Sequence, residues 1–395
     1  AADLQRTNTP FWTGFWEYLW NEMPVPNEVP LQALISEDRL RSYLTDEIAA
    51  RYDNPPTAYV PVPGTTNFET GTPGSVLDVE RAVILIKDAM SSPSARVVNL
   101  SINSVSAPRP SLQNLQILLQ QVIDVSEFDG ITEIYLLDLQ TNQELHFAYQ
   151  SGQVLTPDIA FTAASTMKIP IMASVFQKIG EPAPASIVDQ MELMIERSEN
   201  DPADALMEEA LDGNLGPLKV TEDMQKLGFE NTFLAGYFYP GAPLLYRYTT
   251  PANSRTDINL EPDVYNQTTP AEMGALLDDI YQCAQTGGGP FAVVFPGEIT
   301  QNECKQMITF LTRNKIGVLI EAGLPEGTQV AHKHGWITEG DGLIHTISDA
   351  GIIYTTGGNY VLTIYMNHPI QLQFQPANIL FADLSRAVYN YFNLQ

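Results

Sequence analysis

The sequence predicts an α+β protein of two folded parts, a larger one built on an antiparallel sheet and a smaller one that precedes it. The chain has 395 residues. A single hydrophobic core stops growing near ~250–300 residues, so a chain of this length is expected to form more than one domain. The apolar fraction of 44% is sufficient for sizeable cores. In the larger part, β-rich segments at residues 131–149 and 329–366 enclose a long, mostly helical stretch. This order favours one sheet assembled from both ends of the domain, with the helices in a second lobe.

An aromatic-rich segment occupies residues 1–30. Trp12, Trp16 and Trp20 are spaced four apart, so that on a helix they would lie on one face. This stripe either packs on another part of the protein or forms a membrane-proximal or partner-binding surface, because tryptophan favours interfaces. We expect no transmembrane span in this chain, since no apolar run approaches ~20 residues.

Residues 31–108 are expected to form the smaller α+β domain. Ser36 is placed to cap its first helix. A proline-rich run at residues 107–110 then breaks the chain, so the domain boundary is expected between residues 108 and 109. Two further elements are predicted from periodicity, an amphipathic helix at residues 75–90 and a strand at residues 96–105.

The larger domain, residues 109–395, shows a regular succession of elements. Its helical middle is expected to extend from Ser165 to about Asn314. The elements predicted around it are a helix at 111–125, a hairpin of strands at 131–139 and 144–149, strands at 329–338, 344–354 and 360–366, and a last helix at 377–392.

The charge composition excludes several classes of partner. With 47 acidic and 20 basic residues the net charge is −27, which works against binding of nucleic acid or anionic lipid, since both need a basic surface. No histidine lies at metal-ligand spacing from Cys283 or Cys304, so we expect no metal site and no other cofactor. These two cysteines are either buried thiols or one disulfide.

Ser165-Thr166-Met167-Lys168 is the first of three short motifs that suggest chemistry. On a helix, residues three apart share a face, so the Ser165 hydroxyl and the Lys168 amine would meet. A serine becomes a good nucleophile when an adjacent base takes its proton, and a lysine serves as that base when burial lowers its pKa. The alternative is a helix-capping serine followed by an exposed lysine.

The other two motifs follow in chain order. Ser198-Glu199-Asn200 lies between two predicted helices and offers a hydroxyl and an amide, unless it is only a turn that caps the next helix. Lys333-His334-Gly335-Trp336 lies in an otherwise apolar strand. Glycine there permits close approach of another chain or a ligand.

In this order and context, the three motifs resemble those of the serine β-lactamase and penicillin-binding protein superfamily, and are most similar to those of class A β-lactamases. The similarity extends to residues 161–165, 268–273 and 349–353. The resemblance implies a β-lactamase/transpeptidase-like fold for residues 109–395, and a reaction through a serine acyl-enzyme.

The resemblance also implies a role for each residue. The oxyanion hole would consist of the N–H groups of Ser165 and Trp336, next to Gly335. The remaining roles are the nucleophile Ser165, its base or proton relay Lys168, the proton shuttle Ser198, Asn200, which holds Lys168 and the substrate amide, and Lys333, which attracts the substrate carboxylate.

One departure from the family concerns His334, which replaces the usual threonine or serine of the K-[T/S]-G motif. A hydroxyl that normally contacts the substrate carboxylate is thereby lost. Histidine can still donate a hydrogen bond there, and at low pH carry a charge. The alternative is that His334 points away from the cleft.

A second departure concerns the omega loop, which in class A enzymes carries a R-x-E-x-x-L-N motif whose glutamate activates the deacylating water. The corresponding stretch, residues 230–269, contains no such motif. Asp257 and Glu261 are the acids nearby, and both are weak candidates for the missing base. Without a placed general base we expect the acyl-enzyme to be hydrolysed slowly.

Residues 31–108 resemble a peptidoglycan-binding type of domain found beside cell-wall enzymes, through residues 68–74, 77–82 and 97–100. The resemblance implies a secreted protein, extracellular, on the cell surface or periplasmic, whose leader has been removed. Disulfides form in such compartments, which favours a bridge between Cys283 and Cys304. The alternative for this domain is an appendage that only orients the larger one.

The sequence thus leads to an expected function with one alternative. We expect a serine hydrolase that acts on β-lactams, on D-Ala-D-Ala-type wall peptides, or on both, with peptidoglycan as a further partner. The alternative is a non-hydrolytic wall-binding protein whose larger domain has lost turnover. The retention of Ser165, Lys168, Ser198, Asn200 and Lys333 argues against that loss.

Overall fold

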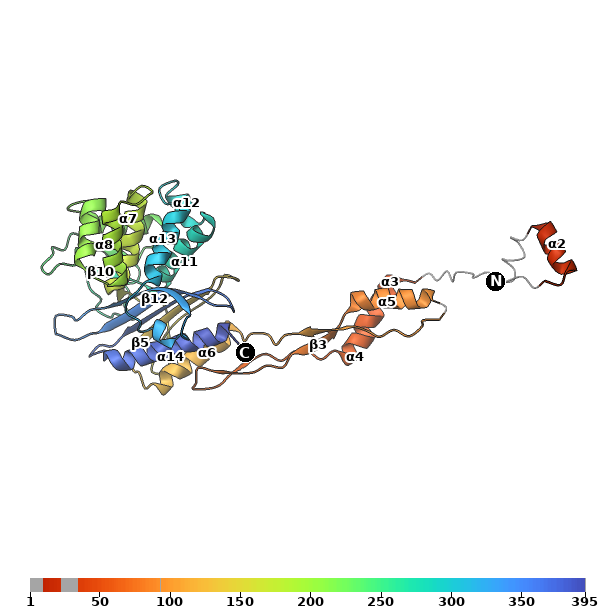
Figure 1. Cartoon of the computed structure of the whole chain (residues 1–395). Coiled ribbons are helices and arrows are strands. Elements are labelled where there is room, and N and C mark those ends of the chain that lie inside the picture. The colour runs from red at the N-terminus through yellow and green to blue at the C-terminus, as the bar shows by residue number, and fades with distance from the viewer. Residues whose placement is uncertain (1–9, 23–34, 93, 395) are drawn as a thin grey trace. The chain divides into compact units, whose positions relative to one another are not determined.

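The structure is a computed structural model that describes residues 10–22, 35–92 and 94–394 (Figure 1). The chain divides into two compact units. The first unit comprises residues 1–58 and 71–108, and the second comprises residues 59–70 and 109–395. Each unit is described by itself below.

Residues 59–70 belong to the second unit, whereas the sequence assigned them to the smaller domain. Strands β1 (Val60–Pro61) and β2 (Phe68–Glu69) pair there as a short antiparallel hairpin. The ring of Phe68 lies 6.2 Å from that of Tyr391, and Asn390 Nδ2 donates to the carbonyl of Thr66 over 2.8 Å. This hairpin therefore packs on the C-terminal helix.

Trp12 and Trp16 of the predicted aromatic stripe lie on helix α2 (Phe11–Leu19), and Trp20 follows it as the C-cap. None of the residues of this helix is buried, and Trp12 and Trp16 are 66% and 54% exposed. Residues 1–9 and 23–30 of the predicted aromatic segment, and residues 31–34 of the next domain, lie outside the described residues. What the stripe contacts stays a prediction.

The rest of the first unit is a small α+β structure with two corrections to its predicted elements. The helix expected from residue 75 begins at Val79, because Asp78 caps it by accepting the N–H of Arg81 over 2.9 Å. Residues 74–77 instead form a strand that pairs with residues 102–105. The strand predicted at residues 96–105 is therefore shorter than expected and begins at Ile102. The elements are α3 (Glu37–Tyr43), the π-turn η1 (Leu44–Ala49), α4 (Ala50–Tyr52), β3 (Gly74–Leu77), α5 (Val79–Ser91) and β4 (Ile102–Val105), packed around Leu44, Leu77, Ala82 and Val83.

The second unit is built on one antiparallel sheet with the strand order β11-β12-β13-β5-β6-β7. Strands from the two ends of the domain meet where β13 pairs with β5, so the predicted assembly from both ends is confirmed. The edge strand β7 was not predicted. The strands are β5 (Ile131–Asp138), β6 (Gln143–Gln150), β7 (Gln153–Leu155), β11 (Gln329–Trp336), β12 (Thr346–Tyr354) and β13 (Tyr360–Asn367).

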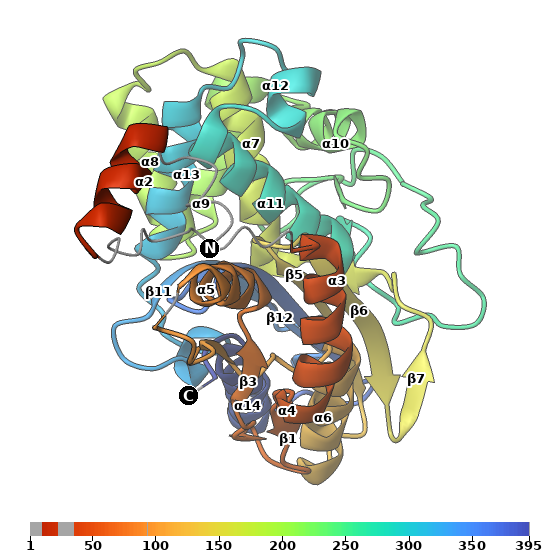
Figure 2. The same ribbon diagram turned by 90° about the vertical axis from the view of Figure 1, so that its right-hand side faces the viewer.

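Helices cover both faces of this sheet. Every residue of β5 and β13 is buried, since α6 (Leu112–Val125) and α14 (Phe374–Phe392) lie on one side of the strands and a helical lobe lies on the other (Figures 1 and 2). The lobe comprises α7 (Lys168–Lys178), α8 (Ala185–Glu196), α9 (Asp201–Leu206), the π-turn η3 (Met207–Leu211), α10 (Gly216–Lys226), α11 (Pro270–Thr286), α12 (Pro290–Val294) and α13 (Gln301–Thr312).

A second, short sheet joins the lobe to the main sheet. Its strand order is β8-β10-β9, from β8 (Phe161–Thr162), β10 (Asn266–Thr268) and β9 (Phe233–Leu234). The irregular loop at residues 235–265, here called the omega-type loop, connects β9 to β10. Because β8 leads directly into the turn that holds Ser165, this sheet places the loop beside that turn.

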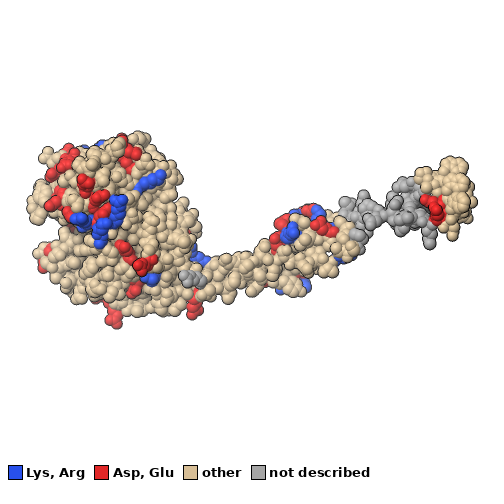
Figure 3. All heavy atoms as spheres, in the orientation of Figure 1, with Lys and Arg blue, Asp and Glu red and all other residues tan. Residues whose placement is uncertain are grey.

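The composition argues against binding of nucleic acid or anionic lipid, and the surface charge and the hydropathy of the helices are relevant to both. On the face drawn in Figure 3, basic side chains lie among acidic ones and form no continuous basic surface. Within the described residues, no helix combines the length and apolar character that a membrane span needs.

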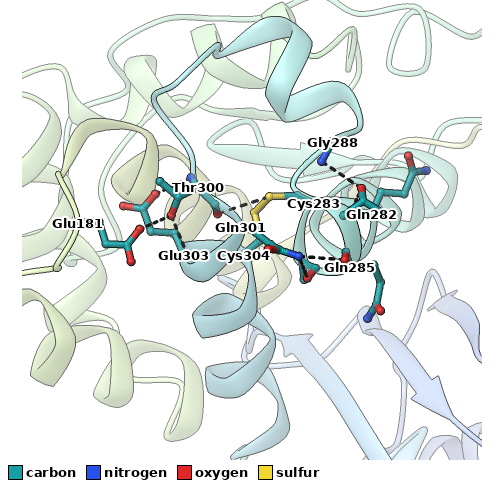
Figure 4. Close-up of a disulfide and its surroundings, with 11 residues drawn as sticks. Glu181, Gln282, Cys283, Gln285, Gly288, Thr300, Gln301, Glu303 and Cys304 are labelled. Atoms are coloured by element: carbon teal, nitrogen blue, oxygen red, sulfur yellow. Dashed lines mark hydrogen bonds between the residues drawn. A yellow bond between two sulfur atoms is a disulfide. The ribbon is translucent and has the colours of Figure 1, made fainter.

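Cys283 on α11 and Cys304 on α13 are joined by a disulfide, with their Cα atoms 5.9 Å apart (Figure 4). Both residues are buried. The start of α13 is fixed beside the bridge, since Thr300 caps this helix and its hydroxyl donates to Glu181 over 2.7 Å. The bridge ties two long helices of the lobe together.

Reduction of this disulfide is expected to destabilise the second unit by about 3 kcal/mol, because it frees the denatured chain from a closed loop. Urea unfolding with and without dithiothreitol measures the effect. The variant C283A/C304A serves as the control, and its free energy of unfolding should not respond to the reductant. An equal response of both proteins would contradict the prediction.

Candidate active site

Ser165 lies in the 3-10 turn η2 (Ala164–Met167), between β8 and α7. The preceding Ala164 has a left-handed φ of +47°, and its N–H donates to Asn266 Oδ1 over 2.7 Å. Thr166 Oγ1 donates to the carbonyl of Ala163, also over 2.7 Å. These bonds hold the turn so that Ser165 is the one half-buried residue among fully buried neighbours.

The Lys168 amine is completely buried and lies 3.0 Å from Ser165 Oγ. It donates to the carbonyl of Ser198 over 2.7 Å and to Asn200 Oδ1 over 2.8 Å. Burial lowers the pKa of Lys168 to about 7, although the nearby carboxylates of Asp204 and Glu199 oppose the change. A substantial fraction of this amine is therefore neutral at pH 7 and able to accept a proton from Ser165.

The Ser198 hydroxyl lies between two lysine amines. Its Oγ is 2.9 Å from Lys333 Nζ and 3.5 Å from Lys168 Nζ, and a left-handed backbone with φ of +63° directs it there. Burial, and then repulsion from the amine of Lys168, hold the pKa of Lys333 well below its ordinary value. The three groups form a continuous path for protons.

Strand β11 lies directly against the turn that carries Ser165. A side chain at Gly335 would place its Cβ 2.7 Å from the carbonyl oxygen of Ala163 and 3.0 Å from the nitrogen of Thr166. Only glycine fits at this distance. The strand therefore brings Lys333 and the backbone of Trp336 to the turn, and all five predicted catalytic side chains belong to one cluster.

The predicted role of His334 is not supported. Its side chain lies on the face of β11 opposite to that of Lys333, because neighbouring residues in a strand point to opposite faces. The ring stacks on that of Trp336 with 4.6 Å between centroids, and only 2% of the residue is exposed. Burial and neighbouring cationic side chains lower the pKa of His334 to about 2. His334 thus packs as a neutral ring against Trp336.

An aromatic ring of the omega-type loop covers Lys168. The ring of Phe238 lies with its centroid 5.4 Å from Lys168 Nζ. Its position is set by Asp204 on α9, whose carboxylate accepts the N–H of Phe238 over 2.8 Å and that of Tyr239 over 2.9 Å. In the described chain, the hydrogen-bond partners of Lys168 Nζ include no carboxylate.

Neither weak candidate for a deacylation base contacts this cluster. The Asp257 carboxylate pairs with Arg255, whose guanidinium also donates to the carbonyl of Pro157 over 2.7 Å. Glu261 is exposed and lines a separate cavity beside His345. Both side chains are directed elsewhere, because the loop is anchored to the turn at residues 156–158.

Among the residues that the structure describes, one group of side chains outside the cluster has atoms close enough to hold a metal ion. The ligand atoms of Glu133, His146 and Asp158 all lie within 4.8 Å of one another. However, the buried Glu133 carboxylate already accepts hydrogen bonds from the His146 ring over 2.9 Å and from the N–H groups of Asp158 and Ile159. The hydrogen bonds to Glu133 form a structural network, which holds the segment that leads into β8 and Ser165.

The site therefore combines a buried lysine paired with a half-buried serine, and a second lysine across a bridging serine, on a two-lobed α+β fold. A profile of the Beta-lactamase enzyme family matches residues 180–392. The match covers more than half of the chain and includes Ser198, Asn200 and Lys333. The chain therefore belongs to the Beta-lactamase enzyme family.

Solved structures share this fold at low sequence identity. PBP-A has a TM-score of 0.51 at 20% identity, covering 73% of this chain and 99% of that chain, and a mutant of it in an acyl-enzyme complex with penicillin-G gives the same values. A β-lactamase from Sphaerobacter thermophilus has a TM-score of 0.50 at 18% identity, covering 70% and 97%. One from Xanthomonas campestris has a TM-score of 0.50 at 17% identity, covering 70% and 98%. A comparison with curated proteins found no match.

Three residues that shape the site were not predicted. Asn266 could have been found from its place just before Thr269, the residue that caps α11. Asp204 is a buried acid four residues after Asn200. This spacing places both residues on one helical face, so it would have indicated Asp204 only if the helix at α9 had been known. Phe238 has no sequence signal, since its contact with Lys168 depends on how a long loop folds back.

Proposed function

We propose that the second unit forms an acyl-enzyme at Ser165 with β-lactams or with D-Ala-D-Ala-type wall peptides, and releases the acyl group slowly. The observation that carries this proposal is the Lys168 amine, which is buried, 3.0 Å from Ser165 Oγ, and has a pKa of about 7. PBP-A, which shares the fold, has been captured in a mutant form as an acyl-enzyme with penicillin-G.

Acylation begins with proton transfer from Ser165 Oγ to the neutral Lys168 amine. Oγ then attacks the amide carbonyl carbon, and the carbonyl oxygen becomes an oxyanion that accepts hydrogen bonds from the N–H groups of Ser165 and Trp336. In this role the N-terminus of α7 helps, because the helix dipole favours negative charge there.

Collapse of the tetrahedral intermediate breaks the carbon–nitrogen bond and leaves the acyl group on Ser165. The leaving nitrogen needs a proton, and the Ser198 hydroxyl supplies it. Ser198 is re-protonated from the lysine amines, since its Oγ lies 2.9 Å from Lys333 Nζ and 3.5 Å from Lys168 Nζ. The proton that Lys168 took from Ser165 thereby reaches the leaving group.

Hydrolysis of the acyl-enzyme is expected to be slow because, among the described residues, neither carboxylate near Lys168 hydrogen-bonds to its amine. That of Asp204 accepts the N–H groups of Phe238 and Tyr239, and Glu199 is exposed. The position over Lys168 is taken by the apolar ring of Phe238, 5.4 Å from the amine. An apolar ring neither orients a water nor accepts its proton. A general base at such a position typically contributes about a hundredfold or more to the rate.

The first unit and the compartment form the second part of the proposal. We propose that the first unit binds peptidoglycan and that the protein acts outside the cytoplasm. The Cys283–Cys304 disulfide supports an oxidising compartment. The full chain should co-sediment with insoluble peptidoglycan, and recovery in the supernatant with and without peptidoglycan alike would contradict binding.

Labelling with a fluorescent penicillin tests the acyl-enzyme. The full chain should be labelled and stay labelled through denaturing electrophoresis, whereas S165A should show no label. S186A, which removes an exposed serine on α8, should be labelled like the parent protein. Labelling of S165A, or no labelling of the parent protein, would contradict the proposal.

Replacement of the covering ring by an acid tests the cause of slow release. F238E places a carboxylate beside Lys168, and the release rate of the acyl group should rise by about a hundredfold. The measurement is loss of the fluorescent label with time. The control Y246E adds the same acid at an exposed position of the same loop and should leave the rate unchanged. Equal acceleration by both variants would assign the effect to loop disruption.

A further inference from the structure

A buried chain of charges lies on the face of β11 that points away from Ser165. The ring of His332 is completely buried. Its Nδ1 lies 3.0 Å from both carboxylate oxygens of Asp349 on β12, and its Nε2 lies 3.1 Å from Glu321 Oε2 on the 3-10 turn η4 (Glu321–Gly323). Each ring nitrogen therefore faces a carboxylate.

The hydrogen-bond geometry favours a proton on each ring nitrogen of His332. Its Nε2 lies 3.1 Å from Glu321 Oε2 and 3.2 Å from Asn314 Nδ2. The Asn314 amide Nδ2 lies near this ring, but it has two acceptors of its own, His334 Nδ1 at 3.1 Å and the carbonyl of His332 at 3.4 Å. Asn314 thus needs no acceptor from the His332 ring. Although burial opposes the charged form, Asp349 and Glu321 raise the pKa of His332 to about 9.

The charged ring joins three segments of the second unit. Asp349 also accepts the N–H of Ile320 over 3.1 Å, so β11, β12 and the turn η4 meet at one carboxylate. Gly351 lies opposite His332 in the sheet, and a Cβ there would lie 2.7 Å from the Cβ of His332. The sheet therefore leaves room for the imidazole only because glycine is its partner.

This arrangement adjoins the proton path of the site. Lys333 follows His332 in β11 and points to the other face, toward Ser198. Burial and the amine of Lys168 lower the pKa of Lys333, whereas the carboxylate of Asp349 raises it. The positive charge of His332, in contact with that carboxylate, offsets its field.

We propose that His332 in its charged form is a positioning residue for acylation. It fixes β11 so that the Lys333 amine meets the Ser198 hydroxyl. Its positive charge also offsets the negative charge of Asp349, so that the pKa of Lys333 stays low enough for protons to pass between Lys333, Ser198 and Lys168. The groups that face its ring are Asp349 from β12, Glu321 from η4, the amide of Asn314, and the neutral ring of His334 on its own strand. This inference rests on the proposed acyl-enzyme.

The pH dependence of labelling by a fluorescent penicillin, at pH 5.5 to 9.5, tests the role. H332Q should lower the plateau rate by about tenfold and move the acidic limb to lower pH. The shift is expected because the negative charge of Asp349, no longer offset by His332, raises the pKa of Lys333. A Lys333 that stays protonated in turn lowers the pKa of Lys168 by repulsion. H332N/D349N removes both charges together and should return the limb to its original pH. E321Q, at the half-exposed end of the chain of charges, should give a smaller shift.

The free energy of unfolding of the parent protein, measured as a function of pH, provides a test that does not depend on activity. The folded pKa of His332, about 9, lies above its ordinary value of 6.5, so this contribution is complete below pH 6.5 and is lost as the pH rises through 9. H332Q should lack that part of the decline. Unfolding curves at pH 6.5, 8 and 9.5 measure it.

The outcomes separate this inference from the proposed function. Absence of labelling in the parent protein contradicts the acyl-enzyme, and the stability curves then decide whether His332 carries its charge. Labelling of H332Q with the parental plateau and limb overturns the inference. A lowered plateau with an unmoved limb also overturns it, since that pattern indicates a purely structural role. Parallel stability curves for the parent protein and H332Q would overturn the assigned charge.

Discussion

Removal of one lysine amine from water is the constraint on which the site depends. Lys168 is fully buried, and the partners of its amine in the described part of the chain are hydroxyl, carbonyl and amide oxygens of Ser165, Ser198 and Asn200, with no carboxylate. Burial therefore destabilises the charged form without an ion pair to restore it, and the amine becomes a base near neutral pH. The rest of the second unit serves this placement: the helical lobe encloses the amine, the short sheet fixes the turn that carries Ser165, and the strand with Gly335 approaches close enough to bring Lys333 to Ser198.

Patterns that depend on local spacing were predictable. The order of strands and helices gave the antiparallel sheet built from both ends of the domain, and the three-residue spacing of Ser165 and Lys168 placed the two side chains together. The compartment that the family resemblance implies favoured the observed bridge between Cys283 and Cys304. Only the serine–lysine pair is determined within one turn of chain, whereas the sheet was inferred from the order of the elements.

Features that depend on tertiary packing were not predictable. A family role was expected of His334, but strand alternation turns its ring to the face opposite Lys333, where Trp336 stacks on it. The acids Asp257 and Glu261 lie in the stretch that corresponds to the family's omega loop, yet the anchoring of Arg255 holds that part of the loop elsewhere. Phe238 reaches Lys168 only because a buried acid on a distant helix binds its backbone. The hairpin at residues 59–70 joins the second unit because Phe68 finds an apolar partner there. These outcomes depend on side chains far apart in sequence.

The central claim is that a neutral Lys168 activates Ser165, and the most direct test is the pH dependence of the acylation rate constant with saturating fluorescent penicillin. The rate constant should rise about tenfold per pH unit at low pH and level off near the pKa of Lys168, about 7. K168R keeps a cation that does not lose its proton in this range, and it should remove the rise together with nearly all labelling. A rate constant that stays flat from pH 5.5 to 8, or that levels off only above pH 10, would contradict the account.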